Sequence, residues 1–164
     1  MVKFEDIRMN NKEIDHVMSK CLPSKNWAGI FPSDKIPFSI CRNCDFGIIC
    51  NTDSSQQKGE HWIAIFLPEY GVPEYFDSFG GPPNVKIFSD FLSNGEYIYN
   101  SVQIQSDDGF TCGHYCIFFL LCRFIGIRYY DIMSFFTMDL AINDQYVFEF
   151  VKNVDEKCKN TWVP

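Results

Sequence analysis

Residues 105–123, Q-S-D-D-G-F-T-C-G-H-Y-C-I-F-F-L-L-C-R, constrain the fold more than any other stretch of the chain. The first part is polar and turn-like, because Ser-Asp-Asp-Gly occupies positions 106–109. The second part is apolar on every side, and a helix without a polar face has to be buried. We therefore predict a buried central helix around which the rest of the chain packs.

Cys112 is predicted to occupy the first position of this helix, because Thr111 is a residue type that caps helix N-termini. The first N–H groups of a helix have no internal partner and carry the positive end of the helix dipole. A thiol at this position has its thiolate stabilised, and the spare N–H groups can bind an oxyanion. Most free cysteines are nonetheless structural, so a catalytic Cys112 needs a base from elsewhere in the chain.

The composition indicates a globular protein. A chain of 164 residues with 46% hydrophobic residues predicts a single domain over 1–164. No apolar run reaches the roughly 18 residues of a spanning helix, so we expect no membrane association. Residues 1–6 are too charged for a signal peptide, and we read the eight cysteines as reduced intracellular thiols. The net charge of −7 argues against a surface built mainly for nucleic acid.

Short elements are predicted on either side of the central helix from hydrophobic periodicity and turn residues. Segment 27–37 contains several prolines without a clear period and is predicted to be a loop. The remaining predictions are helices over 5–21, 85–92, 130–138 and 143–158, and strands over 46–50, 61–67, 74–81 and 97–105.

A histidine and an aspartate are predicted to meet at one end of a hairpin. The strands over 61–67 and 74–81 are separated by a turn and should pair antiparallel. The start of one strand then lies near the end of the other, so His61 and Asp77 become neighbours. Such a pair serves either as a structural hydrogen bond or as part of a catalytic site, and both interpretations remain open at this point.

Of the three histidines, His61 is the best candidate for a base. A cysteine protease needs a base beside its nucleophile. His114 follows Cys112 by two residues, so on a helix its side chain points about 200° away. His16 lies on the polar side of a predicted surface helix, where a histidine is usually solvated.

The remaining parts of such a site are also present. Asp77 ends the partner strand and could orient the base. Gln105 supplies a neutral side-chain N–H donor just before the nucleophile, suited to an oxyanion hole shared with the Cys112 N–H.

Cys41 and Cys44 form a C-x2-C pair, with Cys50 close behind. A structural zinc site usually needs two such pairs. The other close spacing, Cys112 and Cys116, lies inside the apolar helix. We therefore predict no metal site.

Four motifs in a fixed order resemble one protease family. His61-Trp62, Asp77 in FDSFG, and Gln105 seven residues before Cys112 in CGHYC are similar to the adenovirus-type maturation proteases. These belong to the wider clan that includes the SUMO-deconjugating proteases. FDSFG and CGHYC strings are typical of the versions carried by Polinton-like and adintovirus-like elements. The resemblance covers most of the chain.

The resemblance implies an α+β fold, in which a buried central helix with the cysteine packs on a mixed sheet with the histidine and the acid. It implies that Trp62 and Gly113 contact the substrate. Its catalytic residues would be the nucleophile Cys112, the general base His61, the third triad member Asp77 and the oxyanion-hole residue Gln105.

Members of this family cut viral precursor proteins after small residues, often at Gly-Gly or Gly-x-Gly sites. The resemblance therefore implies a cysteine endopeptidase for capsid precursors, active inside the host cell and packaged in the virion. Two alternatives stay open: an isopeptidase for ubiquitin or a ubiquitin-like modifier, and a non-enzymatic interaction module with a relict site.

The chain also departs from the adenoviral pattern. Those enzymes are activated by DNA and by a short peptide that forms a disulfide with a cysteine between the acid and the glutamine. Residues 78–104 contain no cysteine, and the chain is acidic. The sequence therefore argues against a covalent peptide cofactor and more strongly against activation by DNA.

Overall fold

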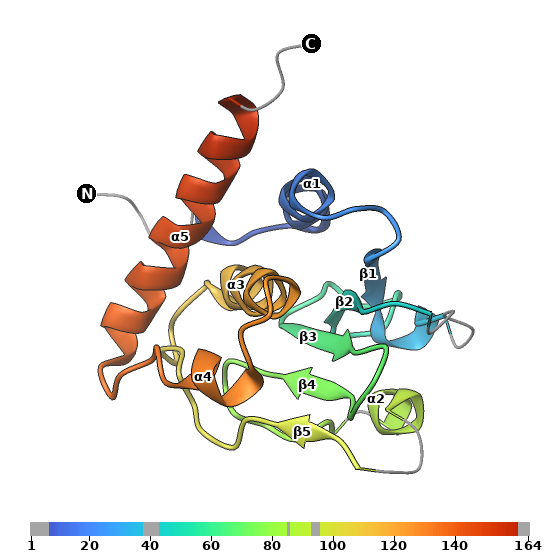
Figure 1. Ribbon diagram of the computed structural model, residues 1–164. Coiled ribbons are helices and arrows are strands. Elements are labelled where there is room, and N and C mark those ends of the chain that lie inside the picture. Colours follow the sequence, from blue (N-terminus) through green and yellow to red (C-terminus); the bar gives the residue numbers. More distant parts are fainter. Residues whose placement is uncertain (1–6, 38–42, 85, 93–95, 161–164) are drawn as a thin grey trace.

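The computed structural model describes residues 7–37, 43–84, 86–92 and 96–160. Helix α3 lies across a sheet whose strands are arranged in the order of the chain (Figure 1). The elements are α1 (Asn11–Cys21), β1 (Trp27–Pro32), the 3-10 helix η2 (Ser33–Lys35), β2 (Phe46–Asn51), β3 (Trp62–Leu67), β4 (Glu74–Phe76), α2 (Lys86–Phe91), β5 (Ile98–Tyr99), α3 (Cys112–Phe124), α4 (Tyr129–Met133) and α5 (Leu140–Asn160).

The sheet is mixed, which confirms the predicted α+β fold. β2–β3 and β3–β4 pair antiparallel, whereas β1 is parallel to β2 and β5 is parallel to β4. The two parallel pairs, β1–β2 and β4–β5, lie at the two ends of the sheet. β3 lies between them and forms the hairpin with β4.

Both faces of the sheet are covered, and this explains why β3 is apolar throughout. Ala64 and Phe66 belong to the core shared with α3. Ile63 and Ile65 belong to a second core with α2, because neighbouring side chains of a strand point to opposite faces. A strand buried on both faces reads as a continuous hydrophobic run.

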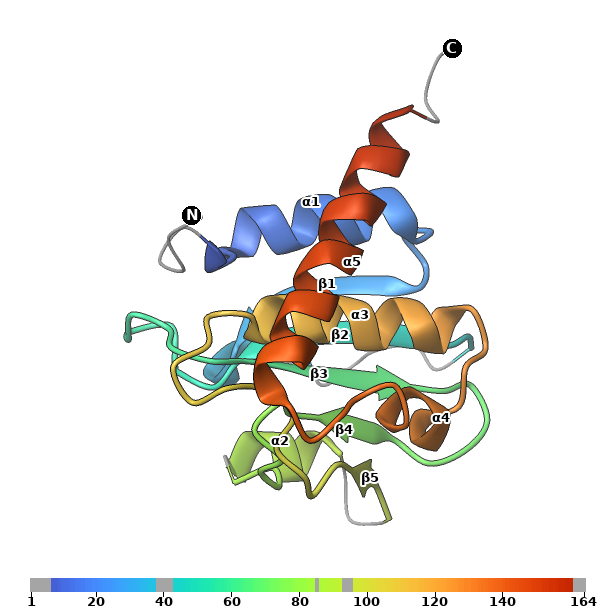
Figure 2. The same ribbon diagram turned by 90° about the vertical axis from the view of Figure 1, so that its left-hand side faces the viewer.

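Helix α3 is buried over most of its length, as its sequence predicts. It rests on the sheet, with α1 and α5 against its other sides (Figure 2). The rings of Phe119 in α3 and Phe76 in β4 stack at 4.5 Å between centroids. At its far end Arg123 forms a bidentate ion pair with the buried Glu74 of β4, at 2.6 and 3.0 Å.

Helix α1 begins later than the predicted 5–21. Asn10 accepts hydrogen bonds from the backbone N–H groups of Lys12 and Glu13, and the Glu13 carboxylate accepts from the Asn10 N–H. This reciprocal capping box fixes the start of the helix at Asn11. Residues 5 and 6 lie outside the described part of the chain.

Two other predictions were wrong. Segment 27–32 is the strand β1, because pairing with β2 outweighs its weak local pattern, and the register shift at Gly29, with φ +112°, accommodates the irregularity. The predicted strand 97–105 is reduced to Ile98–Tyr99. Beyond Tyr99, the side-chain amides of Asn100 and Gln103 donate hydrogen bonds to loop carbonyls, and the pairing of β5 with β4 does not continue.

Two more elements are shorter than predicted: strand 74–81 is reduced to β4, which leaves Asp77 just beyond its end, and helix 130–138 is reduced to α4. The other predicted helices and strands are present with shifted ends, and the second closing helix is α5. Among the described residues, no helix is both long and apolar enough to cross a membrane.

Candidate active site

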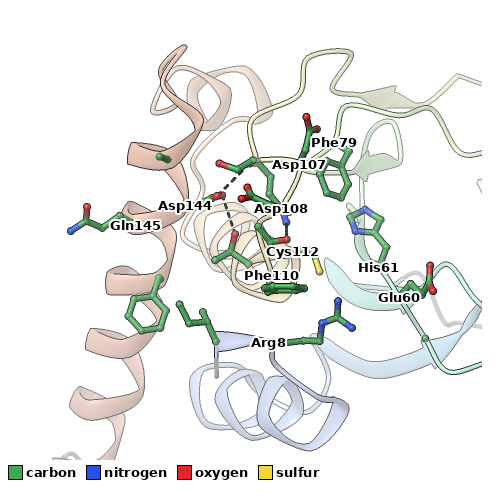
Figure 3. Close-up of a pocket in the computed structure, with 18 of the residues that line it drawn as sticks. Arg8, Glu60, His61, Phe79, Asp107, Asp108, Phe110, Cys112, Asp144 and Gln145 are labelled. Atoms are coloured by element: carbon green, nitrogen blue, oxygen red, sulfur yellow. Dashed lines mark hydrogen bonds between the residues drawn. The ribbon is translucent and has the colours of Figure 1, made fainter. Parts of the chain in front are cut away.

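The hairpin brings His61 and Asp77 together as predicted. His61 Nε2 lies 2.7 Å from Asp77 Oδ1. Cys112 also interacts with the imidazole and raises the pKa of His61. In Figure 3 the Cys112 sulfur and the His61 ring face one another at a cavity of about 1380 Å³. Both residues line this cavity, together with Gln105.

Cys112 is the first residue of α3, as predicted, and is 6% exposed. Thr111 holds the capping position, but its hydroxyl makes no hydrogen bond to the helix amides. It donates instead to Asp144 Oδ1 at 3.0 Å. The first N–H groups of α3 therefore receive no side-chain cap from Thr111.

The aspartate is held by its own loop and by Asn100. The Asp77 N–H donates to Asn100 Oδ1 at 3.0 Å, and the Asn100 amide donates to the Asp77 carbonyl. Asp77 Oδ1 also accepts from the Phe79 N–H at 2.9 Å. The Phe79 N–H thus fixes the carboxylate oxygen that faces the imidazole, and Asn100 fixes the main chain of Asp77. The ring of Phe79 packs 4.9 Å from that of His61.

The electrostatics of the site favour a charged imidazole. Burial alone lowers the pKa of His61, but the hydrogen bonds and charges of Asp77 and Cys112 outweigh it and raise the pKa to about 9. The imidazolium is therefore the dominant form of His61 at neutral pH. An imidazolium beside a thiol stabilises the thiolate, the form of cysteine that acts as a nucleophile.

This shift gives a pH prediction. Protonation of His61 favours the folded state, because its pKa rises from 6.5 to about 9 on folding. The contribution is complete below pH 6.5 and is lost as pH rises through about 9. The melting temperature should therefore fall between these two pH values, and more steeply in the wild type than in His61→Gln. Equal slopes in differential scanning calorimetry would contradict the charged imidazole.

Gln105 is fully buried beneath the cavity and is fixed at both ends of its amide. Its Oε1 accepts from the Ser78 hydroxyl at 2.6 Å, and its Nε2 donates to the Gly109 carbonyl at 2.7 Å. An amide nitrogen carries two protons, and the bond to Gly109 uses one of them. The structure therefore contains the loop contact that a purely structural glutamine would make, and Gln105 also lines the cavity that contains Cys112.

Ser78 connects Gln105 to the loop of the acid, since it follows Asp77 directly. Besides its hydroxyl contact, the Ser78 carbonyl accepts from the N–H groups of Ile104 and Gln105 at 2.9 and 3.2 Å. Gly80 ends this motif with φ +73°, and an added Cβ would lie 2.6 Å from the Val102 carbonyl carbon. The FDSFG string thus requires both its serine and its glycine for close packing on segment 102–105.

The two residues predicted to contact substrate lie differently. Trp62 lines a neighbouring hollow of about 450 Å³ that also contains Cys112, and its indole N–H donates to the Met9 carbonyl at 3.2 Å. Gly113 faces α1, where an added Cβ would lie 3.1 Å from Ile14 Cδ1. Its missing side chain therefore permits the packing of α1 against α3.

The other two histidines are separated from this chemistry. His114 packs 5.5 Å from the Phe148 ring, and its Nδ1 is buried without a hydrogen-bond partner. Burial lowers the pKa of His114 to about 4, so it is neutral. His16 has an exposed side chain, 3.6 Å from Asp155, as its position on the polar face predicts.

Cys41 of the C-x2-C pair lies outside the described residues, and Cys44 is a free thiol near the Lys25 carbonyl. Over the described ranges, no group of three or more histidine, cysteine or acidic side chains is arranged to hold a metal.

Sequence reasoning missed three residues that support the site: Ser78, Asn100 and Asp144. Ser78 lies inside a recognised motif, and its position next to Asp77 was the available signal. Asn100 and Asp144 act across 23 and 33 residues of sequence, on Asp77 and Thr111 respectively. Nothing local distinguishes them from ordinary polar residues of a loop and a helix.

The chain is similar in sequence to proteases of African swine fever virus. The cysteine protease S273R of isolate Tick/Malawi/Lil 20-1/1983 is 24% identical over 168 residues, which cover 92% of this chain and 56% of that protein. The protein of strain Badajoz 1971 is 28% identical over 125 residues, covering 68% of this chain and 44% of that protein. These relatives are cysteine proteases. The chain spans about half the length of the curated relatives it matches.

No protein-family model matches the chain. Among solved structures, the African swine fever virus pS273R protease gives a TM-score of 0.47 with 25% identity, over 65% of this chain and 42% of that one. The central domain of the Lpg1148 protein from Legionella pneumophila gives 0.53 with 10% identity, over 90% of this chain and 98% of that one. The second likeness concerns the fold alone.

Proposed function

We propose that the chain is a cysteine endopeptidase domain, 1–164, with Cys112 as nucleophile, His61 as general acid and base, and Asp77 as the residue that orients His61. The observation that carries this proposal is the His61–Asp77 contact of 2.7 Å beside a cysteine at the first position of a buried helix. The cysteine protease names of the relatives support it.

The proposed reaction uses the groups as they lie. The Cys112 thiolate attacks the peptide carbonyl, and the developing oxyanion is held by the Cys112 N–H and the second amide N–H of Gln105. The His61 imidazolium then gives its proton to the leaving amine, which leaves a thioester on Cys112. Neutral His61 next takes a proton from water, which attacks the thioester and releases the acid. Asp77 keeps the imidazole in one orientation throughout.

For the substrate, we propose viral precursor polypeptides cut at glycine-containing sites, as in the adenovirus-type maturation proteases. Trp62 and Cys112 line the same hollow, so a peptide bound at the nucleophile would pass the indole ring. The corresponding setting is the infected cell and the virion, with capsid proteins as partners and without a covalent peptide cofactor or DNA.

A second candidate is a protease for a ubiquitin-like modifier, because three curated relatives carry the name SUMO-1 cysteine protease. Vinyl-sulfone derivatives of SUMO and ubiquitin distinguish the two, since a modifier protease forms a covalent adduct and a strict precursor protease does not. One test applies to both candidates: the purified chain should hydrolyse a fluorogenic peptide that ends in Gly-Gly. If neither the peptide nor a capsid precursor is cut and no probe reacts, the proposal fails.

Gln105 provides a test of the oxyanion hole. Gln105→Ala should lower kcat by roughly 10²–10³ with little change in KM, because the donor acts on charge that appears only in the transition state. Gln105→Glu should be at least as harmful, since it places negative charge against the oxyanion. If Gln105 only supports the loop at Gly109, the melting temperature falls and kcat per folded molecule is unchanged. Both quantities are measured on the same preparations.

A further inference from the structure

Asp144 is a buried carboxylate that contacts three polar groups of the segment around the nucleophile, one of which, the Tyr115 hydroxyl, also lies 2.7 Å from the Ile104 carbonyl. Asp144 is 8% exposed and lies in the first turns of α5. Its Oδ2 accepts from the Ser106 N–H at 3.3 Å, and its Oδ1 lies 3.0 Å from each of the hydroxyls of Thr111 and Tyr115. Dashed lines in Figure 3 run from Asp144 toward the loop before Cys112.

The bond to Thr111 has a consequence for α3. Threonine is a strong N-cap residue, and a capping side chain bonds the second or third N–H of its helix from an extended backbone conformation. Thr111 instead has φ −97° and ψ 7°, and its hydroxyl is directed to Asp144. The N–H groups that a capping Thr111 would occupy are those of Gly113 and His114, directly beside the reacting sulfur.

These amides adjoin the Cys112 N–H and form with it the positive end of α3, at which the oxyanion develops in the proposed reaction. A hydroxyl oxygen bound to them would reduce the positive potential at the Cys112 N–H and would repel the charge of the oxyanion. An ordinary cap would thus make the helix more stable and the site less effective. Asp144 prevents this loss because it accepts the hydrogen bond of the Thr111 hydroxyl and so keeps that hydroxyl away from the helix amides.

We propose that Asp144 is a positioning residue that holds Thr111 out of the capping conformation and so keeps the oxyanion site at the start of α3 open. This inference rests on the proposed function and deepens it. Asp144 does not touch the reacting atoms. It acts through Thr111, and its bond to the Ser106 N–H fixes the loop that carries Gln105.

The test measures hydrolysis of a fluorogenic peptide ending in Gly-Gly. Asp144→Ala frees the Thr111 hydroxyl, and kcat should fall about 10- to 100-fold while KM stays within about twofold, because only transition-state binding is lost. The rate of Cys112 alkylation by iodoacetamide, which forms no oxyanion, should be unchanged. A kcat equal to that of the wild type, or an alkylation rate that falls with kcat, would overturn the proposal.

The decisive experiment combines two substitutions. Thr111→Val removes the hydroxyl and keeps the shape, so the double variant Asp144→Ala/Thr111→Val should recover most of the kcat lost in Asp144→Ala. A role of Asp144 in packing alone predicts the opposite, because the double variant then lacks both partners and is no more active than the single one. That result would refute the proposal.

Matched variants complete the design. Asp144→Asn retains an acceptor for Thr111 and should keep most of the activity. Lys152→Ala, at an exposed position of α5 outside the lining of the cavity, should be neutral. If Asp144→Ala does not fold, Asp144→Glu displaces the carboxylate by one methylene and should show the same rescue by Thr111→Val. Cys112→Ala gives the baseline: an active Cys112→Ala would refute the proposed function, whereas an inactive one with a fully active Asp144→Ala refutes only this inference.

Discussion

Cys112→Ala should abolish peptide hydrolysis while the protein remains folded. The substitution removes one sulfur atom at the first turn of α3, and alanine is the best helix former, so the helix is retained. Without the thiolate no thioester forms, and residual catalysis by binding and the oxyanion site should lie several orders of magnitude below the wild type. Hydrolysis of a Gly-Gly peptide, with the circular dichroism spectrum and melting temperature of the same sample, measures both parts.

Cys116→Ala is the matched control, because Cys116 is a free thiol of the same helix, one turn further on, and fully buried. Burial raises the pKa of Cys116 well above its usual value, so it stays protonated and unreactive. Its replacement should lower stability modestly through a small cavity and leave kcat close to that of the wild type. Activity retained by Cys112→Ala, or lost in Cys116→Ala at full folding, would assign the nucleophile to the wrong residue.

His61→Ala should reduce hydrolysis to background, and Asp77→Asn should leave weak but measurable activity. His61 carries the proton in both half-reactions, so nothing replaces it. Asp77 acts through the imidazole, whose tautomer it selects, and in such triads the corresponding loss with asparagine is about 10⁴ in kcat. Single-turnover measurements with a peptide ester and a peptide amide distinguish the role of His61 from that of Asp77, because only the amide needs a proton for its leaving group.

Asn100→Ala is informative beside this pair. It removes the side chain that accepts from the Asp77 N–H and donates to the Asp77 carbonyl, while both triad side chains remain. We expect a smaller loss than for Asp77→Asn. A stronger effect of Asp77→Asn than of His61→Ala would reverse the proposed roles of base and orienting residue.

The sequence predicted those features of the fold and site that depend on local pattern. The all-apolar run after Cys112 can only be a buried helix, and a hairpin of two short strands leaves little freedom in where His61 and Asp77 meet. The motif order added the α+β arrangement. These predictions agree with the structure because each depends on residues that are close in sequence or on one tight turn.

The predictions that were wrong depend on distant partners. β1 becomes a strand because β2 is beside it, and the segment after Tyr99 leaves the sheet because Asn100 bonds the loop of Asp77. Thr111 has the identity of an N-cap residue and does not act as one, because Asp144, 33 residues later, takes its hydroxyl. No window of sequence contains both partners of these contacts.

The two ends of α3 are each anchored by a carboxylate from another element: Asp144 holds Thr111 at the start, and Glu74 holds Arg123 in the last turn. A helix of 13 residues is about 20 Å long and barely compresses along its axis. The helix therefore moves as a rigid body that is held at both ends. The position of the Cys112 sulfur relative to the His61 ring then depends on both carboxylate contacts. A small displacement of β4 relative to Arg123 would then shift the whole helix and with it the nucleophile. A residue about 20 Å from the reacting atoms thus helps to position Cys112 against His61.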